Sequence, residues 1–422
     1  MKQKTLISDT LIEDRYLRLQ NGFIYILIIY TFLYSNVVRS MLTNLLHVNL
    51  LYSFLPTLLI AGYYLFFFKK ASKFVIYIFL FIFLLSMISV FYYHIEISRF
   101  YRFLYSILIP LLLVGIHLER TKYTIKKFLF LYNIVIIINV IYGVMDFISG
   151  KKLQMILANL LYNTNYYTSI NWDIQSQVYR LFSILGHPLT NMFLLVIFIG
   201  VNLAYNHYYK EKASVPMYIV YGITILGTLV CNSKFGIIIV CATLLSIIMV
   251  GSNKVRNLVL LLIISISVLS IGPIKQNVVQ RFLMASESGD LSNGRLSALD
   301  YLSDSNVPLP HIFTGEGMGA SDSLLQSVSD LNNIEMPFVM YMYDYGIVVT
   351  ILIYIIFYLF PISIFIKNKH FYLCYLYTLI FVFANSYNGM AVSIGITQIL
   401  TFVAMLLVNM SNKLKKQSIL EP

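Results

Sequence analysis

Long apolar segments alternate with short polar connections along almost the whole chain. A helix needs about 20 mostly apolar residues to cross a hydrocarbon core about 30 Å thick. On this criterion the pattern predicts twelve transmembrane helices, at residues 21–38, 50–68, 74–92, 103–117, 128–148, 188–205, 216–231, 235–250, 257–272, 337–366, 371–386 and 390–409. We therefore expect an all-α, polytopic integral membrane protein, in which residues 1–422 form a single membrane domain.

Two connections on one side of the predicted bundle are much longer than the others. They cover residues 149–187 and 274–336, and the second is rich in Ser, Asp, Asn and Gly. Within it, residues 274–285 and 294–302 are predicted to form short amphipathic helices, and the proline-containing stretch 303–310 is predicted to be a turn-rich break. We expect the working groups of the protein where these two loops meet the lipid surface.

Composition supports this architecture and explains the charge. The chain is 59% hydrophobic and 11% charged, whereas a soluble domain carries about 25% charged residues. Its net charge of +12 would suit nucleic-acid binding, but 20 of the 30 Lys and Arg residues fall in connections on one side. Because cytoplasmic loops attract Lys and Arg, we expect a multi-pass plasma-membrane protein with both termini cytoplasmic and no nucleic-acid partner.

The cysteines and acidic residues suggest no metal centre. Cys231, Cys241 and Cys374 all fall in or at apolar spans, so we expect buried, inert thiols. Asp304 and Asp322 lie in a loop that offers oxygen ligands for a cation, but their spacing fits no defined metal-binding loop. We therefore expect neither a metal nor another cofactor.

Arg180 opens a polar stretch that ends at His187, immediately before the predicted span at 188–205. One interpretation is that the arginine extends to the lipid headgroups. Outer-side arginine is disfavoured in this orientation, however, and the planar guanidinium binds phosphate through two parallel hydrogen bonds. Arg180 is therefore also a candidate phosphate ligand. His187 is a candidate for positioning a substrate, although a histidine before proline more often caps a turn.

Lys234 lies in the short connection between two predicted spans of about 16 residues each. At 1.5 Å per residue, such helices are about 24 Å long, which is shorter than the hydrocarbon core. Lys234 is thus either an outer hairpin lysine or a charge below the surface that lines a cavity. In the first long loop, Trp172 fits an interfacial aromatic belt, and the alternative is a ring that stacks on a sugar.

The second long loop adds Arg295 and three closely spaced glycines. Arg295 follows Gly294 and belongs either to a solvated helix face or to a phosphate site. Gly315, Gly317 and Gly319 resemble a dinucleotide-binding fingerprint only superficially, because no strand precedes them. We expect a tight turn whose backbone N–H groups are candidate donors to a phosphate.

Glu335 precedes Pro337 at the start of the predicted span at 337–366. The positive end of a helix dipole favours the ionised carboxylate, which is the form that a general base needs. The alternative is an acid that only caps the helix. Asp344 lies about two turns deeper and is expected to pair with other groups inside the bundle.

The order of these motifs resembles that of the O-antigen polymerase and O-antigen ligase superfamily. The resemblance covers roughly residues 180–346 and depends on motifs arranged around one large loop: Arg180 with Gly186-His187-Pro188, Ser233-Lys234-Phe235-Gly236, Gly294-Arg295, the glycines at 315–319, and the segment from Glu335 to Gly346. Within the superfamily, the chain looks most like a polymerase of capsular or exopolysaccharide repeat units.

The resemblance implies a glycosyltransferase on the outer face of the bacterial plasma membrane. Such an enzyme moves a glycan from a polyprenyl diphosphate carrier to an acceptor sugar hydroxyl. It implies that Arg180, Arg295 and Lys234 bind the diphosphate, that Glu335 is catalytic, and that His187 and Trp172 position the substrate. The expected partners are a polyprenyl-diphosphate-linked oligosaccharide and membrane lipid, with a flippase and a chain-length regulator as candidate protein partners.

Two alternatives remain open. In the ligase branch of the superfamily a histidine precedes the span after the large loop, whereas this chain has Asn332, Asn333, Ile334 and Glu335 there. A flippase or transporter of lipid-linked oligosaccharide would explain twelve spans equally well. It predicts polar groups in a central cavity and broken helices at mid-membrane, whereas the polar groups of this chain gather in the loops.

Overall fold

A computed structural model provides the fold. It describes residues 18–31, 35, 37–39, 41–42, 61–63, 65–66, 71–160, 164–211, 214–250, 254–270, 272–287, 299–300, 302, 309–327, 334–392 and 394–420. Within these ranges all regular structure is helical, apart from an isolated antiparallel bridge between Ala71 and Ile116. The prediction of an all-α protein is therefore confirmed for the part of the chain that the structure describes.

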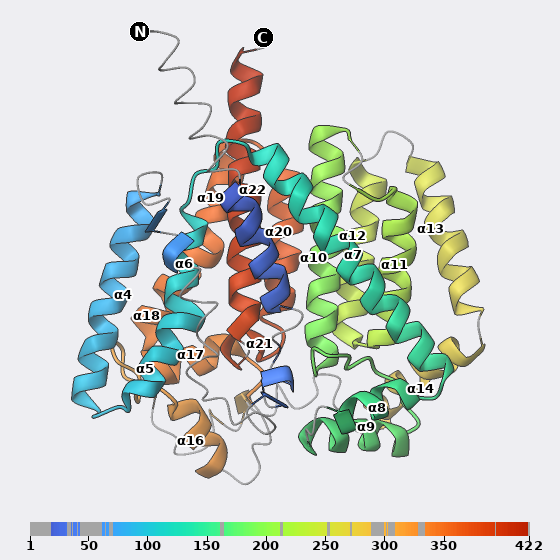
Figure 1. The fold of residues 1–422 in the computed structure, drawn as a ribbon, viewed down its shortest axis with the longest axis horizontal. Helices are drawn as coiled ribbons and strands as arrows, with labels where there is room; N and C mark the ends of the chain where they lie inside the picture. The colour runs from blue at the N-terminus through green and yellow to red at the C-terminus, as the bar shows by residue number, and fades with distance from the viewer. Residues whose placement is uncertain are drawn as a thin grey trace.

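The long helices run up and down through one bundle (Figure 1). Two of them contain a π-helical turn, η3 (Leu104–Leu108) and η4 (Ile355–Leu359). In chain order the helices of the bundle are α4 (Lys73–Tyr92), α5 (Ile97–Phe103) with α6 (Ile109–Val114), α7 (Thr121–Ile148), α10 (Pro188–Tyr209), α11 (Met217–Cys231), α12 (Lys234–Val250), α13 (Lys254–Leu269), α18 (Ile347–Tyr354) with α19 (Phe360–Lys367), α20 (Phe371–Ala384), and α22 (Ile394–Leu420).

The helices α10 and α22 form the centre of the bundle. Of the most apolar 18-residue window in each, 94% and 89% respectively is buried inside the protein. Neighbouring helices approach α10 closely at Gly200, where an added Cβ would lie 2.9 Å from Ile380 of α20. Small residues allow such close backbone approach between apolar helices. These two helices therefore contact mainly protein, and the outer helices shield them.

Within the described residues, six helices are long and apolar enough to cross a membrane, which fits an α-helical membrane protein. Three of the twelve predicted spans, at 216–231, 235–250 and 371–386, appear as shorter apolar helices. The predicted spans at 21–38 and 50–68 lie partly or mostly outside the described residues. The six long helices are Lys73–Tyr92, Ile97–Val114, Thr121–Ile148, Pro188–Tyr209, Ile347–Lys367 and Gly395–Gln417.

The predicted span at 337–366 is wrong as a single helix. α17 (Pro337–Tyr345) ends at Gly346, whose φ of 94° interrupts the helix before α18 begins. The turn around residues 311–316 packs against this break, because the backbone N–H of Val348 donates to the carbonyl of Ile312 (2.9 Å). A Cβ on residue 346 would lie 2.7 Å from the carbonyl carbon of Phe313. A tertiary contact thus breaks a segment whose apolar pattern is continuous.

The expectation for the cysteines is correct at one position only. Cys231 is buried, whereas Cys241 is exposed on α12 and Cys374 is half-buried on α20. The expectation of buried thiols assumes that a cysteine in an apolar span faces the inside of the protein. In a membrane helix, however, apolar residues also form the outward surface, so hydrophobicity does not distinguish the two faces.

The two ends of the bundle differ (Figure 1). One end, here called the loop end, carries the described parts of both long connections, which include several short helices. At the opposite end, here called the basic end, helices begin or end near Lys73, Arg120, Lys210, Lys254 and Lys367. The helices of the loop end are α8 (Lys152–Leu160), α9 (Thr164–Gln175), α14 (Gly272–Glu287), α16 (Ala320–Ser327) and α17. α14 confirms the helix predicted at 274–285.

Candidate functional site

A buried ion-pair group lies at the loop end, beside α9. The Asp173 carboxylate is fully buried and accepts hydrogen bonds from Nε (3.0 Å) and Nη2 (2.5 Å) of Arg180. On its other side, Nζ of Lys151 lies 3.1 Å from Oδ2, as an ion pair without hydrogen-bond alignment. Burial lowers the pKa of Lys151, and the charge of Asp173 opposes that shift. Two cations therefore share one carboxylate, which leaves the group positively charged.

A second buried carboxylate anchors the chain around this group. Asp146, near the end of α7, accepts hydrogen bonds from the backbone N–H (2.8 Å) and the side-chain amide (2.6 Å) of Gln154, and from the hydroxyl of Tyr179 (2.9 Å). Oε1 of Gln154 in turn accepts from the N–H of Phe182 (2.6 Å). A carboxylate without solvent contact needs such donors. These bonds tie α7 and α8 to the segment that carries Arg180.

Three asparagines fix the same segment from other helices. Asn277 of α14 accepts from the N–H of Tyr179 (2.7 Å) and donates to its carbonyl (3.1 Å). Asn232, at the end of α11, donates to the carbonyl of Asn277 (3.2 Å), and Asn191 of α10 donates to that of Leu181 (3.0 Å). The segment has no regular structure, yet its buried backbone groups are satisfied. Arg180 therefore extends from a fixed base.

The guanidinium of Arg180 also contacts two aromatic rings. Its central carbon lies 5.5 Å from the ring centre of Trp172 and 5.6 Å from that of Phe182. Such cation–π contacts restrict the orientation of an arginine. The Arg180 side chain remains 21% exposed and Trp172 is 49% exposed. The structure thus brings together two of the residues predicted from the sequence, and both remain accessible.

Arg281 of α14 and Glu335 complete the charged group. Burial lowers the pKa of Arg281, the charge of Arg180 lowers it further, and Asp173 and Glu335 oppose this effect. These interactions place Arg281 within electrostatic range of all three residues. Its Nε is buried and has no hydrogen-bond partner in the described structure. We call Lys151, Asp173, Arg180, Arg281 and Glu335 the charge cluster.

His187 lies next to the charge cluster and caps α10. Its Nδ1 accepts a hydrogen bond from the N–H of Leu189 (3.3 Å), and its ring is parallel to that of Tyr387, with centres 6.4 Å apart. The ring is accessible to solvent although protein surrounds it on most sides. Burial, followed by the positive charge of Arg180, lowers the pKa of His187 to about 4, against the weaker opposite effect of Asp173. The capping interpretation is therefore correct, and the ring is neutral at physiological pH.

Of the remaining predicted site residues, the structure describes Lys234 and Glu335. Lys234 begins α12 at the loop end and is partly buried. Two residues earlier, Asn232 donates to the carbonyl of Tyr179 (3.4 Å), so this hairpin abuts the segment that carries Arg180. Arg295 lies outside the described residues, and so does Asp304. Glu335 precedes Met336, the N-cap residue of α17, so it is not itself the cap.

The glycine segment is a turn, as predicted, and two of its N–H groups donate to backbone carbonyls of the protein. Gly315, Gly317 and Gly319 have φ values of 62°, 96° and 90°. The N–H of Glu316 donates to the carbonyl of Tyr343 (2.7 Å), and that of Gly315 donates within the turn. The bond from Glu316 holds the turn against α17, and the two bonds occupy N–H groups that a bound phosphate would otherwise use.

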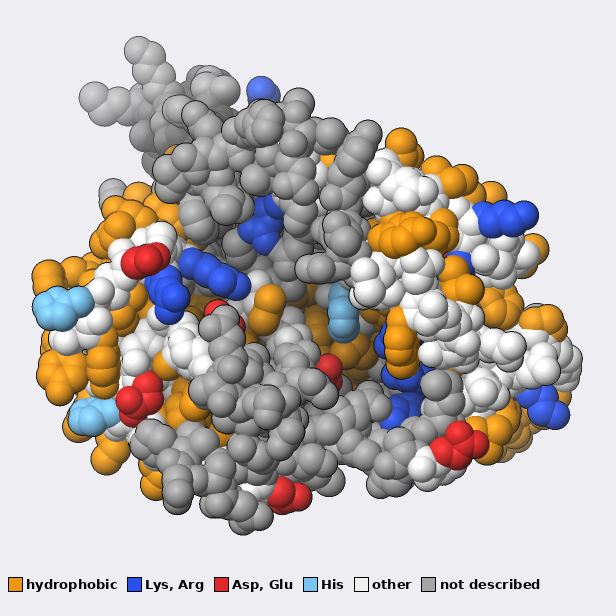
Figure 2. Space-filling view, turned by 90° about the horizontal axis from the view of Figure 1, so that it is seen from below, with side chains coloured by type: hydrophobic (Ala, Val, Ile, Leu, Met, Phe, Trp, Pro, Cys, Tyr) orange, Lys and Arg blue, Asp and Glu red, His pale blue; other side chains and the backbone are white. Residues whose placement is uncertain are grey.

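A polar pocket of about 230 Å³ lies between α5, α16 and α17. Arg99 and Arg102 line it, together with Asp322 and Asp344. The buried Asp344 accepts hydrogen bonds from the N–H (2.8 Å) and hydroxyl (3.0 Å) of Ser321, so it pairs inside the protein as predicted. Figure 2, which looks onto the loop end, shows basic side chains both on the side of α4 and α5 and on the side of α8 and α9.

The charge cluster has the properties of an anion site. Three cationic side chains converge with one fully buried and one partly buried carboxylate. Guanidinium groups bind diphosphate oxygens through directed hydrogen bonds, and lysine contributes a point charge. Among the described residues, no group of three or more His, Cys, Asp or Glu side chains is placed to hold a metal ion. The cationic side chains of the cluster are groups that can neutralise a bound anion.

Lys151, Asp173 and Arg281 were not predicted from the sequence. Lys151 and Arg281 lie on the predicted outer side, where basic residues are disfavoured. The same signal had selected Arg180, so it could have selected them as well. Asp173 gave no comparable signal, because an acid in a polar loop is ordinary. Only the fold reveals that its side chain is buried between two cations.

The fold and this site define an all-helical protein with long apolar helices and a buried charge cluster at one end of its bundle. No family model matches the chain, and no curated protein or solved structure matches it either. The physical arrangement of the cluster is therefore the basis for a functional proposal.

Proposed function

We propose that the protein is a polysaccharide repeat-unit polymerase of the bacterial plasma membrane, with the loop end on the outer face. Its donor is a glycan carried on polyprenyl diphosphate, and its acceptor is a sugar hydroxyl. The observation that carries the proposal is the pairing of Arg180 and Lys151 with the buried Asp173, with Arg281 within electrostatic range of Arg180, Asp173 and Glu335. The resemblance of the motif order to the O-antigen polymerases supports the same proposal.

In this reaction the acceptor hydroxyl oxygen attacks the anomeric carbon of the donor sugar. The bond between that carbon and the phosphate oxygen breaks, and polyprenyl diphosphate leaves with the bonding electron pair. Arg180 and Arg281 hold the diphosphate and neutralise the charge that grows on it. Fixed positive groups in a partly dry site stabilise such charge strongly. The hydroxyl proton passes to the carboxylate of Glu335, which acts as the general base.

The buried Asp173 has a separate role in this scheme. It orients Arg180 and offsets part of the positive charge, so the cluster remains folded before substrate binds. A diphosphate then meets cations that are already in place, which lowers the reorganisation required during reaction. Trp172, stacked on Arg180 and half-exposed, is available to contact the sugar next to the diphosphate. Lys234 and His187 border the same segment of chain.

The proposal is tested by incubating the purified protein with a polyprenyl-diphosphate-linked repeat unit and resolving the products on a gel. We expect a ladder of products that differ by one repeat. Glu335→Gln should reduce the rate by about 10²–10⁴-fold, the usual contribution of a general base. Glu287→Gln, which changes an exposed acid on α14, is the matched control and should retain the wild-type rate. Full turnover by Glu335→Gln would exclude the assigned base.

One observation favours a second candidate, a transporter of lipid-linked oligosaccharide. Transporters use helix breaks at their binding sites, and this chain has such a break between α17 and α18 at Gly346, although it lies towards the loop end and transporter breaks lie near mid-membrane. In reconstituted vesicles, this candidate predicts movement of a labelled lipid-linked sugar across the bilayer without lengthening. The polymerase predicts lengthening without a requirement for movement, so one preparation tests both.

A further inference from the structure

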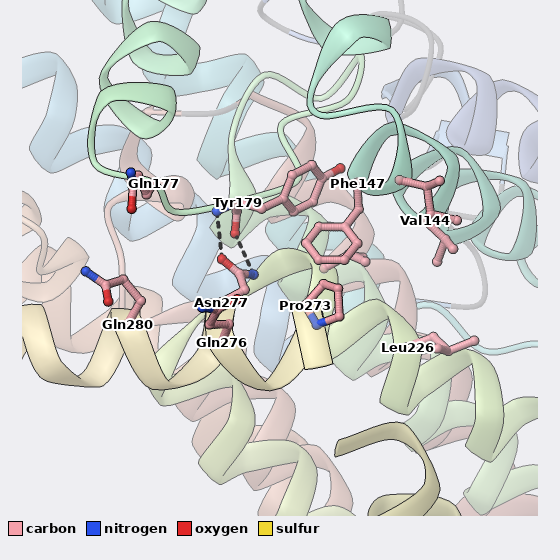
Figure 3. A pocket seen from close by; sticks show the side chains of 11 residues that line it. Val144, Phe147, Gln177, Tyr179, Leu226, Pro273, Gln276, Asn277 and Gln280 are labelled. Atoms are coloured by element: carbon pink, nitrogen blue, oxygen red, sulfur yellow. Dashed lines mark hydrogen bonds between the residues drawn. The ribbon is translucent and has the colours of Figure 1, made fainter. Parts of the chain in front are cut away.

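A groove of about 670 Å³ lies beside the charge cluster, between α7, α11 and α14 (Figure 3). This volume is in the range of small-molecule sites. One wall is apolar and comes from α7 and α11, including Val144, Phe147 and Leu226. The other wall comes from α14 and from the chain that leaves α9. It carries amide side chains at Gln177, Gln276, Asn277 and Gln280.

Three of these amides are available to a ligand. Asn277 is occupied by the two backbone bonds with Tyr179, which Figure 3 shows as dashed lines. The side-chain amides of Gln177, Gln276 and Gln280 make no hydrogen bond to another described residue, and all three are at least partly exposed. Gln276 and Gln280 are four residues apart on α14, so they share one face of the helix. Together they present uncharged donors and acceptors to the groove.

Among the described residues that line the groove, none carries a charged side chain. Two cations of α14 adjoin the amides in sequence: Lys275, which precedes Gln276 and is exposed, and Arg281, which follows Gln280 and lies within electrostatic range of the charge cluster. One helix thus carries neutral amides on one face and a cation on the adjacent face. A ligand that spans both faces would place an anionic part on the cluster and an uncharged polar part in the groove.

The aromatic part of the groove suits the same uncharged ligand. The rings of Phe147 and Tyr179 pack edge to face, with centres 5.0 Å apart. Sugars present C–H groups that pack against such apolar walls, and their hydroxyl and acetamido groups bond to amides. The groove also adjoins the outward face of α7, where Ile141, Met145 and Ile148 are exposed. It therefore lies next to the surface from which a lipid-linked molecule would arrive.

We infer that this groove binds the sugar directly attached to the diphosphate of a lipid-linked glycan. Gln276 and Gln280 donate to and accept from its hydroxyl or N-acetyl groups, while the diphosphate lies on the charge cluster. The inference builds on the proposed function and names where substrate recognition takes place. It assigns specificity to neutral amides, whereas the cationic groups bind the diphosphate whatever sugar it carries.

The test compares two probes with the full-length protein in detergent micelles: polyprenyl diphosphate linked to N-acetylglucosamine, and polyprenyl diphosphate without a sugar. The wild-type protein should bind the sugar-bearing probe more tightly. Gln276→Ala with Gln280→Ala should weaken binding of that probe by about tenfold, as expected for two lost hydrogen bonds, and should leave binding of the sugar-free probe unchanged. Gln417→Ala, at an exposed position of α22 at the basic end, is the matched control.

Equal affinity of the wild-type protein for both probes would overturn the inference, and so would a double variant that keeps the full preference. Both glutamines are accessible, so the double variant should fold, which its thermal unfolding checks. A preparation that prefers the sugar-bearing probe but produces no ladder would refute the polymerase and support the groove. A ladder of products without any preference for the sugar-bearing probe would support the polymerase and refute the role of the groove.

Discussion

Arg180 donates two hydrogen bonds to Oδ1 of Asp173, from Nε at 3.0 Å and from Nη2 at 2.5 Å. The two residues are seven positions apart in the chain. The carboxylate is fully buried, whereas the guanidinium is 21% exposed. The pair therefore has an inner, structural member and an outer, accessible member. Because of this difference in burial, we expect substitution of Asp173 to change mainly the stability of the protein and substitution of Arg180 to change mainly its activity.

Asp173→Asn should strongly destabilise the protein. Removing the carboxylate leaves Arg180 and the buried Lys151 without a counter-charge, and breaking a buried ion pair costs about 3–5 kcal/mol. The measurement is equilibrium unfolding of the detergent-solubilised protein. Glu211→Gln provides the contrast, because its ion pair with Lys122 at the basic end is exposed and should matter little. Equal effects of the two substitutions would contradict the structural role of Asp173.

Arg180→Ala should lower the rate of polymerisation by about 10²–10³-fold, the effect of removing one donor that stabilises transition-state charge. Arg180→Lys should give an intermediate rate, because lysine keeps the charge but loses the planar fork. The assay is elongation of the lipid-linked repeat at equal amounts of folded protein. Lys122→Ala, an exposed cation far from the cluster, should behave like the wild type. If both Arg180 variants polymerised at the wild-type rate, Arg180 would not be a ligand of the diphosphate.

His187 should make folding sensitive to acid. Its pKa in the folded protein is about 4, whereas an unperturbed histidine titrates near 6.5. Above about pH 6.5 the ring is neutral in both states and its contribution is fully present. As the pH falls from about 6.5 to about 4, the unfolded chain binds a proton that the folded chain does not, so stability is lost.

The measurement is the melting temperature at a series of pH values for the wild type and His187→Asn. Asparagine can still accept the hydrogen bond at the start of α10, but it does not titrate. The wild type should lose more stability than the variant within this pH window, and the two curves should run parallel above pH 7. Parallel curves throughout would show that the imidazole titrates normally.

Gly346→Ala should destabilise the protein by about 1–3 kcal/mol, because alanine rarely adopts a positive φ and its Cβ would meet Phe313. Gly222→Ala is the control. This glycine lies inside α11 with no atom within 4 Å of an added Cβ, so alanine should be neutral or stabilising. Thermal unfolding of the two variants compares them directly. A Gly346 variant as stable as the wild type would mean that the break between α17 and α18 relaxes without cost.

Local chemistry determined much of the fold. Runs of apolar residues predicted the start of α10 at residue 188 and the end of α7 at residue 148, although α7 begins at Thr121 and not at 128. They could do so because bilayer thickness sets a length that a sequence displays directly. The polar pattern of the second long loop predicted one of the loop-end helices, α14, at residues 274–285. The same reasoning selected Arg180 and Trp172, because a cation on the disfavoured side and an isolated tryptophan both stand out in a sequence.

Tertiary structure decided the rest. Hydrophobicity could not reveal the break at Gly346, since that break depends on a turn packed from the preceding loop. It could not predict the burial of Asp173, because that depends on how α8, α9 and the segment after α9 pack together. Nor could it predict the approach of Arg281 to Arg180, because these residues are about 100 positions apart in the chain. Sequence patterns record which residues prefer lipid, water or a helix. Only the packed chain determines which distant charges share a desolvated space, and that space gives the charge cluster its chemistry.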